Sequence, residues 1–335
     1  MTARPTIRRI VVVAVLAAVL APRSAAAYLN LSVDLRGQTV RLRWGSSPIR
    51  WFASNRGAPG VLAADFQAAA ARAFATWQAV PSASLSTQFV GFTSASPLFE
   101  DGISTLGFEN RPELDRVLGA TDFTLDTVTG EIVESDIFLN SAFTWSVSAG
   151  GSATAFDVQS VATHEIGHFL GLGHSALGET ELRPDGGRRV LASGAVMFPI
   201  SFGRGNTADR ELQPDDIAGI SDLYPSSTFR AQTGVLHGHV LRGGRPVFGA
   251  HVIAFNPATG QSIAGFVLGD DGSFQIAGLT PGPHVIRVEP LDDADVESFF
   301  DGSVDANFSV TFYDRLFVAP KGGAGEQVDI TVRPK

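Results

Sequence analysis

The sequence between residues 163 and 175 reads THEIGHFLGLGHS and decides how the first half of the chain is interpreted. On a helix, His164 and His168 are neighbours on one face, because they are four residues apart. Two imidazoles at this spacing can bind one zinc ion, with Zn–N distances of about 2.0–2.1 Å. Gly171 can adopt a positive φ, so the chain can leave the helix and turn back, and His174 can then supply a third ligand. Three protein ligands leave one tetrahedral position for water, which is typical of a catalytic zinc site.

Glu165 directly follows the first histidine and is placed to take a proton from that water. A zinc-bound water has a pKa of about 7 rather than about 15.7, and the carboxylate completes its activation. The activated water would attack a peptide carbonyl, and Glu165 would pass the proton to the leaving amine. The roughly opposite face of the helix is apolar and is predicted to face the core; it carries Val158, Ala162, Ile166 and Phe169. Two core histidines and one exposed histidine would be the alternative interpretation, but that alternative does not require the glutamate or the glycine.

The residues from 164 to 174 complete the pattern His-Glu-x-x-His-x-x-Gly-x-x-His, which resembles the metzincin zinc metallopeptidases. Ser175, directly after the third histidine, is similar to the matrixin (matrix-metalloproteinase-like) branch. Metzincins also have a methionine turn beneath the metal, and residues 195–199, AVMFP, are similar to the matrixin version. The resemblance therefore implies a structural role for Met197, and it extends from about residue 40 to residue 224.

The hydrophobic pattern of this part mixes helices and strands. It predicts helices at 63–79, at 157–170 and from 214 onward, and strands at 49–53, 85–90, 103–108, 118–125 and 131–140. This is an α+β pattern. The resemblance implies a zincin domain, with a twisted, mostly parallel sheet, two main helices and a C-terminal helix. It also implies that strand 131–140 is the edge to which a peptide substrate adds, and that loop 199–213 shapes the specificity pocket.

Two departures from the family pattern reduce the expected metal content. None of the seven histidines precedes His164, so we expect one catalytic zinc and no second, structural zinc. Cysteine is absent, so a thiol-based latency switch and disulfide bonds are excluded. Calcium is a further possible ion, with Asp122, Asp126 and Asp136 as candidate oxygen ligands.

Residues 1–27 are typical of a secretory signal peptide. Three arginines precede an apolar run from 10 to 20, and small residues follow up to Ala27, after which we predict cleavage. The run is shorter than the roughly 20 residues that span a bilayer, and no later stretch is apolar enough, so we expect no membrane span. Cleavage would change the net charge from −9 to −13 by removing four arginines, which disfavours nucleic acid as a partner.

The mature chain is predicted to contain two domains: a catalytic domain at 28–225, a linker at 226–230 and an all-β sandwich at 231–335. In the last segment, short β-branched runs alternate with Gly, Pro, Asn and Asp turns, which is typical of a sandwich. Residues 246–250 and 278–282 resemble the carboxypeptidase regulatory-like, transthyretin-like domain. Such domains are usually scaffolds or adhesive appendages.

These observations predict a secreted, monomeric zinc-dependent metalloendopeptidase that cleaves proteins or peptides, with the extracellular matrix as the setting that the resemblance implies. One alternative is a secreted adhesive protein, in which the sandwich carries the function and the zincin domain is auxiliary. Another is a zinc hydrolase that acts on bonds other than peptide bonds. The intact Glu165 argues against an inactive site, and Met197 with the third histidine argues against the other hydrolases.

Overall fold

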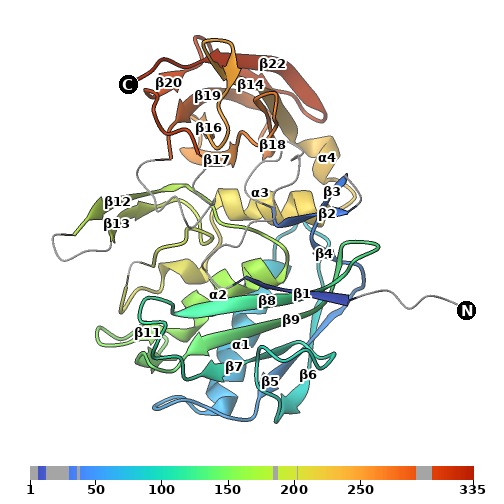
Figure 1. The fold of residues 1–335 in the computed structure, drawn as a ribbon, viewed down its shortest axis with the longest axis vertical. Coiled ribbons are helices and arrows are strands. Elements are labelled where there is room, and N and C mark those ends of the chain that lie inside the picture. The colour runs from blue at the N-terminus through green and yellow to red at the C-terminus, as the bar shows by residue number, and fades with distance from the viewer. Residues whose placement is uncertain (1–6, 13–29, 36–37, 184–187, 202, 292–303) are drawn as a thin grey trace, which may run out of the picture.

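The computed structural model describes residues 7–12, 30–35, 38–183, 188–201, 203–291 and 304–335. The first part of the chain forms a large sheet with two helices on one face, and the last part forms two smaller sheets (Figure 1). Helix α3 (Pro214–Leu223) lies between the two parts. Among the described residues, no helix has both the length and the apolar character needed to cross a bilayer.

The large sheet is mostly parallel, which with the two helices confirms the predicted α+β class. Its strand order is β1-β8-β9-β7-β5-β6, and β4 also pairs with β9. The bounds are β1 (Ile7–Val12), β4 (Arg43–Trp44), β5 (Ile49–Ser54), β6 (Thr87–Thr93), β7 (Thr105–Glu109), β8 (Gly119–Asp126) and β9 (Glu131–Asn140). Only β8 and β1 run antiparallel to their neighbours.

The prediction that strand 131–140 is an edge is wrong. Strand β9 lies inside the sheet, between β7 and β8. The turn at Gly130, where φ is 76°, folds β9 back onto β8, so β8 takes the outer position. Among the described residues, the one strand beyond β8 is β1, which belongs to the predicted signal peptide. The rest of that segment, at 1–6 and 13–27, lies outside the described residues.

Helices α1 (Ala63–Gln78) and α2 (Val158–Phe169) share one hydrophobic core with the sheet. The predicted apolar face of α2 is buried, with Val158, Ala162, Ile166 and Phe169 each at most 1% exposed. Trp77 of α1 donates its indole N–H to the carbonyl of Thr163 over 2.9 Å, which ties the two helices together. Helix α2, which carries two of the histidines, is therefore held in two ways: its apolar face is buried in the core, and α1 is hydrogen-bonded to it.

Several short elements complete this part. They are β2 (Ser32–Leu35), β3 (Gln38–Arg41), β10 (Trp145–Ser146), β11 (Phe156–Asp157), β12 (Gly178–Leu182), β13 (Arg188–Ser193), η1 (Ala208–Arg210) and α4 (Phe229–Gln232). Strands β12 and β13 form a hairpin that extends beside the main body in Figure 1. The hydrophobic pattern did not predict this hairpin, because its side chains are largely exposed and polar.

The C-terminal part consists of two β-sheets around one buried core. The first contains β14 (Gly234–Arg242), β15 (Arg245–Pro246), β18 (Ser273–Leu279) and β22 (Ala324–Thr331). The second contains β16 (His251–Asn256), β17 (Gln261–Phe266), β19 (Gly282–Glu289), β20 (Thr311–Phe312) and β21 (Phe317–Ala319). The likeness to a carboxypeptidase regulatory-like domain and the domain boundaries stay predictions.

Candidate metal centre

The structure brings His164, His168 and His174 together at one point. One ring nitrogen from each lies within 4.8 Å of the others, and no other group of three or more histidine, aspartate or glutamate side chains in the described part of the chain does so. His168 Nε2 and His174 Nε2 are 3.1 Å apart. Two nitrogens about 2.0–2.1 Å from one tetrahedral ion are about 3.4 Å apart, so this spacing fits zinc.

Backbone carbonyls orient the two helical histidines. His164 Nδ1 lies 2.7 Å from the carbonyl oxygen of Val196, and His168 Nδ1 lies 2.8 Å from that of Leu172. A carbonyl can only accept, so each Nδ1 carries the proton, and each Nε2 is the nitrogen whose lone pair could bind a metal. Burial lowers the pKa of His164, and burial together with the neighbouring histidines lowers the pKa of His168 well below its usual range. Both effects favour the neutral imidazole, which is the form that binds a metal.

The third histidine reaches the site through the predicted turn. The φ of Gly171 is 103°, which is in the left-handed region that favours glycine. A Cβ atom at this position would also lie 2.2 Å from the carbonyl oxygen of Leu42, so no other residue fits without a shift of backbone. His174 is 4% exposed and follows this turn by three residues. The prediction for Gly171 is confirmed.

Glu165 is buried beside the histidines, with 5% of its surface exposed. Thr121 of β8 donates its hydroxyl hydrogen to Glu165 Oε2 over 2.8 Å. Burial raises the pKa of Glu165 to about 7, and the hydrogen bond from Thr121 opposes this rise. Gly119 leaves room for the carboxylate, because a Cβ atom there would lie 3.0 Å from Glu165 Oε1. The partnership with strand β8 could not be predicted from the local sequence.

Met197 lies beneath the helix that carries the histidines. A Cβ atom at Gly167 would lie 2.2 Å from Met197 Sδ, so the thioether packs directly against that glycine. Asp216 accepts backbone hydrogen bonds from Val196 and Met197 over 2.8 and 3.1 Å and thereby holds the turn. Asp216 lies in the first turn of α3, where the helix dipole favours a negative charge, and its contact with the turn could not be predicted from the local sequence.

A cavity of about 640 Å³ adjoins His164, Glu165 and His174. The loop that was predicted to shape a pocket lines it with Pro199, Ile200, Ser201, Gly203, Asn206 and Asp209. Two arginines, Arg183 beside the hairpin and Arg188 within it, line it as well and were not predicted. The cavity is therefore large enough for a ligand of several residues and has mixed polar and apolar walls.

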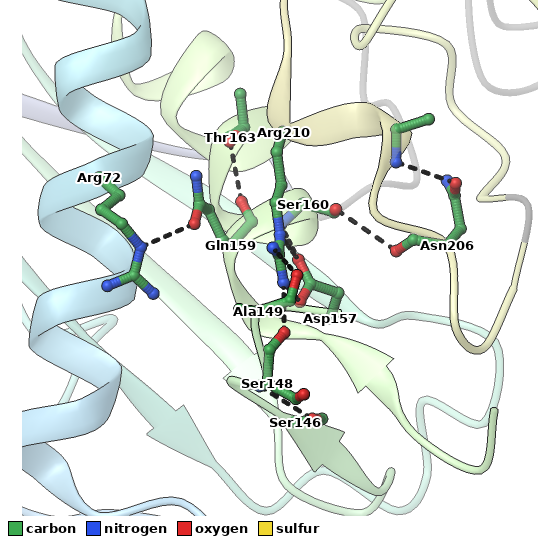
Figure 2. A network of polar contacts seen from close by, with 11 residues as sticks. Arg72, Ser146, Ser148, Ala149, Asp157, Gln159, Ser160, Thr163, Asn206 and Arg210 are labelled. Atoms are coloured by element: carbon green, nitrogen blue, oxygen red, sulfur yellow. Dashed lines mark hydrogen bonds and ion pairs between the residues drawn. The ribbon is translucent and has the colours of Figure 1, made fainter. Parts of the chain in front are cut away.

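A polar network fixes the start of α2 and the end of this loop (Figure 2). Asp157 caps the helix by accepting the N–H of Ser160 over 2.7 Å, and its other oxygen accepts from Arg210 Nη2 over 2.5 Å. Arg210 also donates to the carbonyls of Ser148 and Ala149 over 2.7 and 2.8 Å. One buried carboxylate therefore serves both as the N-cap of the metal-binding helix and as the anchor of the loop.

The comparisons with known proteins support the same class for this part of the chain. Residues 43–184 match the family model described as matrixin. Metalloendoproteinase 1-MMP of Arabidopsis thaliana is 33% identical over 156 residues, which are 46% of this chain and 36% of the relative. Metalloendoproteinase 1 of Glycine max is 45% identical over 71 residues (21% and 18%), and human matrilysin is 36% identical over 74 residues (22% and 22%).

Together, the α+β fold, the histidine cluster and these relatives support a matrixin-like domain over residues 43–184. The chain spans between 18% and 36% of the length of these three relatives. The family match ends before Met197 and before the C-terminal part, so it does not test the predicted roles of either.

The candidate calcium ligands do not converge as a set. Asp122 and Asp136 are direct partners across β8 and β9. Asp126 is four residues further along β8, at a distance of about 13 Å for an extended strand. It instead accepts the backbone N–H groups of Val128 and Thr129 in the turn. Calcium binding therefore stays a prediction without a three-carboxylate site among the described residues.

Proposed function

We propose that this chain is a secreted zinc-dependent metalloendopeptidase that hydrolyses peptide bonds in proteins. The observation that carries the proposal is the convergence of three histidines, two of which are oriented through Nδ1 by backbone carbonyls, beside a buried glutamate in a matrixin-like domain. The relatives named as metalloendoproteinases support the same reaction class. No observation favours the adhesive alternative.

His164, His168 and His174 would hold one zinc ion, which when bound supplies Lewis acidity and an acidified water. Glu165 then acts as the general base: its carboxylate takes the proton of the attacking water and returns it to the leaving amine. Thr121 keeps the carboxylate oriented by its hydrogen bond to Oε2.

We assign β8 as the strand that receives the extended substrate, since it bears Thr121 and lies at the outer side of the sheet. In the structure, Ile7–Val12 pairs antiparallel with residues 121–126 of β8. Cleavage after Ala27 would remove this strand and leave the outer edge of β8 unpaired. Backbone pairing to such an edge gives affinity, and the cavity beside Glu165 would select side chains.

The test is cleavage of a denatured protein substrate by the chain from residue 28 onward, in which the edge of β8 is exposed, in the presence and absence of a chelator. Glu165→Gln should abolish cleavage while zinc binding persists, whereas the matched exposed substitution Glu326→Gln in the C-terminal part should have no effect. Adding zinc after chelation should restore cleavage. Cleavage that survives the chelator or Glu165→Gln would refute the proposal, and a folded, zinc-loaded wild type that cleaves nothing would favour the adhesive protein.

A further inference from the structure

Asp215 of α3 connects the metal centre with the C-terminal part. Its side chain is 2% exposed. Ser175, which directly follows the third histidine, donates its hydroxyl hydrogen to Asp215 Oδ2 over 2.6 Å. Ala264 of β17 donates its backbone N–H to Asp215 Oδ1 over 2.8 Å. One carboxylate therefore holds a residue beside His174 and a strand that begins 38 residues after α3 ends.

The backbone N–H of Ala264 lies at the outer edge of its sheet and bonds to Asp215 instead of to a neighbouring strand. Strand β17 is the outer strand, and β16 is its one neighbour in the described part of the sheet. Ala264 is 2% exposed, so its N–H has lost contact with water and requires a protein acceptor. Asp215 supplies that acceptor and covers an edge that would otherwise be open.

Apolar contacts extend the junction on both sides of Asp215. Leu177 and Ala195 form one buried cluster with Ile253 and Ala264. A second cluster joins the two parts and contains Ala176, Phe198, Phe266, Leu268 and Leu291. On the catalytic side these residues belong to two short segments, 174–177 and 195–198, which carry the third histidine and the methionine turn.

We infer that the C-terminal part is a positioning element of the metal centre, which holds His174 and the methionine turn in place through Asp215 and the two apolar clusters. His164 and His168 are held by α2 and its own core. His174 lies on an irregular segment, and Ser175 and Leu177 next to it are held by groups outside that segment. His164 also depends on the junction in part, because its Nδ1 contacts the carbonyl of Val196 in segment 195–198, whereas His168 contacts Leu172. Loss of the junction should therefore disturb His174 most, His164 less and His168 least.

This inference rests on the proposed function for the identity of the metal, but its test measures metal binding directly. Asp215→Ala removes the shared acceptor. Phe266→Leu loosens the junction from the C-terminal side and leaves every residue of the catalytic part unchanged. Phe308→Leu is the matched control, because Phe308 is equally buried but belongs to the core between the two C-terminal sheets.

The full-length proteins would be loaded with zinc, and zinc release to a chelating dye would be timed; the visible absorption spectrum of the cobalt(II)-substituted proteins reports the ligand geometry. We expect about tenfold faster zinc release and an altered cobalt spectrum for Asp215→Ala and Phe266→Leu, since groups that orient metal ligands contribute about 10- to 100-fold to metal affinity. Phe308→Leu should match the wild type in both.

If Asp215→Ala and Phe266→Leu both release zinc at the wild-type rate and show the wild-type cobalt spectrum, this inference is overturned and the proposed function stays intact. An equal effect of Phe308→Leu would also overturn it, because general loosening of the C-terminal part would then suffice. If Asp215→Ala does not fold, Phe266→Leu decides alone. A folded wild type that binds no zinc would instead refute the proposed function.

Discussion

Two regions of the molecule supply the three histidines, and they are stabilised in different ways. Helix α2 carries His164 and His168, is capped by Asp157 and buries its apolar face in the core of the large sheet. The segment with His174 has no regular secondary structure at that residue and depends on α3 and β17. The first region is organised mainly by its own periodicity, the second by contacts between residues far apart in the sequence. The comparison teaches that one metal centre can combine a locally determined half and a tertiary half.

The largest effect is expected from a substitution of Glu165, the proposed general base, which lies between the two regions. Glu165→Gln should reduce kcat about 10³-fold, because a positioned general base contributes about 10²- to 10⁴-fold. Zinc content should stay at one ion per chain, since Glu165 is not a ligand in the proposal. Steady-state kinetics with parallel metal analysis would check this, and loss of zinc together with activity would contradict it.

The second largest effect is expected at Gly171, which forms the turn between helix α2 and the segment with His174 and is called the hinge below. Gly171→Ala should lower the free energy of unfolding by about 3 kcal/mol, because it forces a positive φ and a contact with the backbone of Leu42. Gly260→Ala is a suitable control, since Gly260 also has a positive φ but nothing lies within 4 Å of its added Cβ atom. Urea denaturation would measure both variants. Equal losses in the two would show that the strain of φ, and not the close approach, dominates.

The segment with His174 is held by Asp215, and through this residue the stability of the protein should depend on pH. Burial raises the pKa of Asp215 to about 7 from an ordinary value of 3.8. A carboxyl whose pKa is raised in the folded state stabilises the fold at low pH, and this stability is lost as the pH rises towards 7. We expect the free energy of unfolding to fall by about 2 kcal/mol from pH 5 to pH 7 through this group.

Asp215→Asn is the variant that checks this pH dependence. The amide can still accept from Ala264 through its oxygen and donate to Ser175, but it does not titrate. The fall between pH 5 and pH 7 should therefore be smaller in Asp215→Asn than in the wild type by about 2 kcal/mol. Parallel curves for the two proteins would show that Asp215 is not the source of the dependence.

The smallest effect expected is at the cap of the helical half. Asp157→Asn keeps an oxygen for the N–H of Ser160 but loses the charge that faces Arg210, so we expect a loss of about 1 kcal/mol in the free energy of unfolding. Thermal denaturation beside the exposed substitution Asp271→Asn would measure it. A loss above about 3 kcal/mol would mean that the loop anchored by Arg210 is as important to the fold as the hinge.

The success of sequence reasoning follows the same division. The α2 helix, its cap at Asp157 and the turn at Gly171 were all predictable, because each depends on residues within a few positions. The edge assigned to strand 131–140 was wrong, because hairpin pairing with β8 depends on register between strands. The hairpin β12–β13 and strand β17 were missed, since the first has mostly exposed polar side chains and the second is a short outer strand.

By itself, the sequence determined the helix with two histidines, the glutamate beside them and the glycine that lets the third return. These features follow from spacing and from the backbone preferences of single residues. Only the tertiary structure decided that β9 lies inside the sheet between β7 and β8, that Thr121 orients Glu165 and that Asp215 joins Ser175 to Ala264. Such contacts join residues 40 or more positions apart, and burial of their polar groups leaves no periodic pattern in the chain from which they could be predicted.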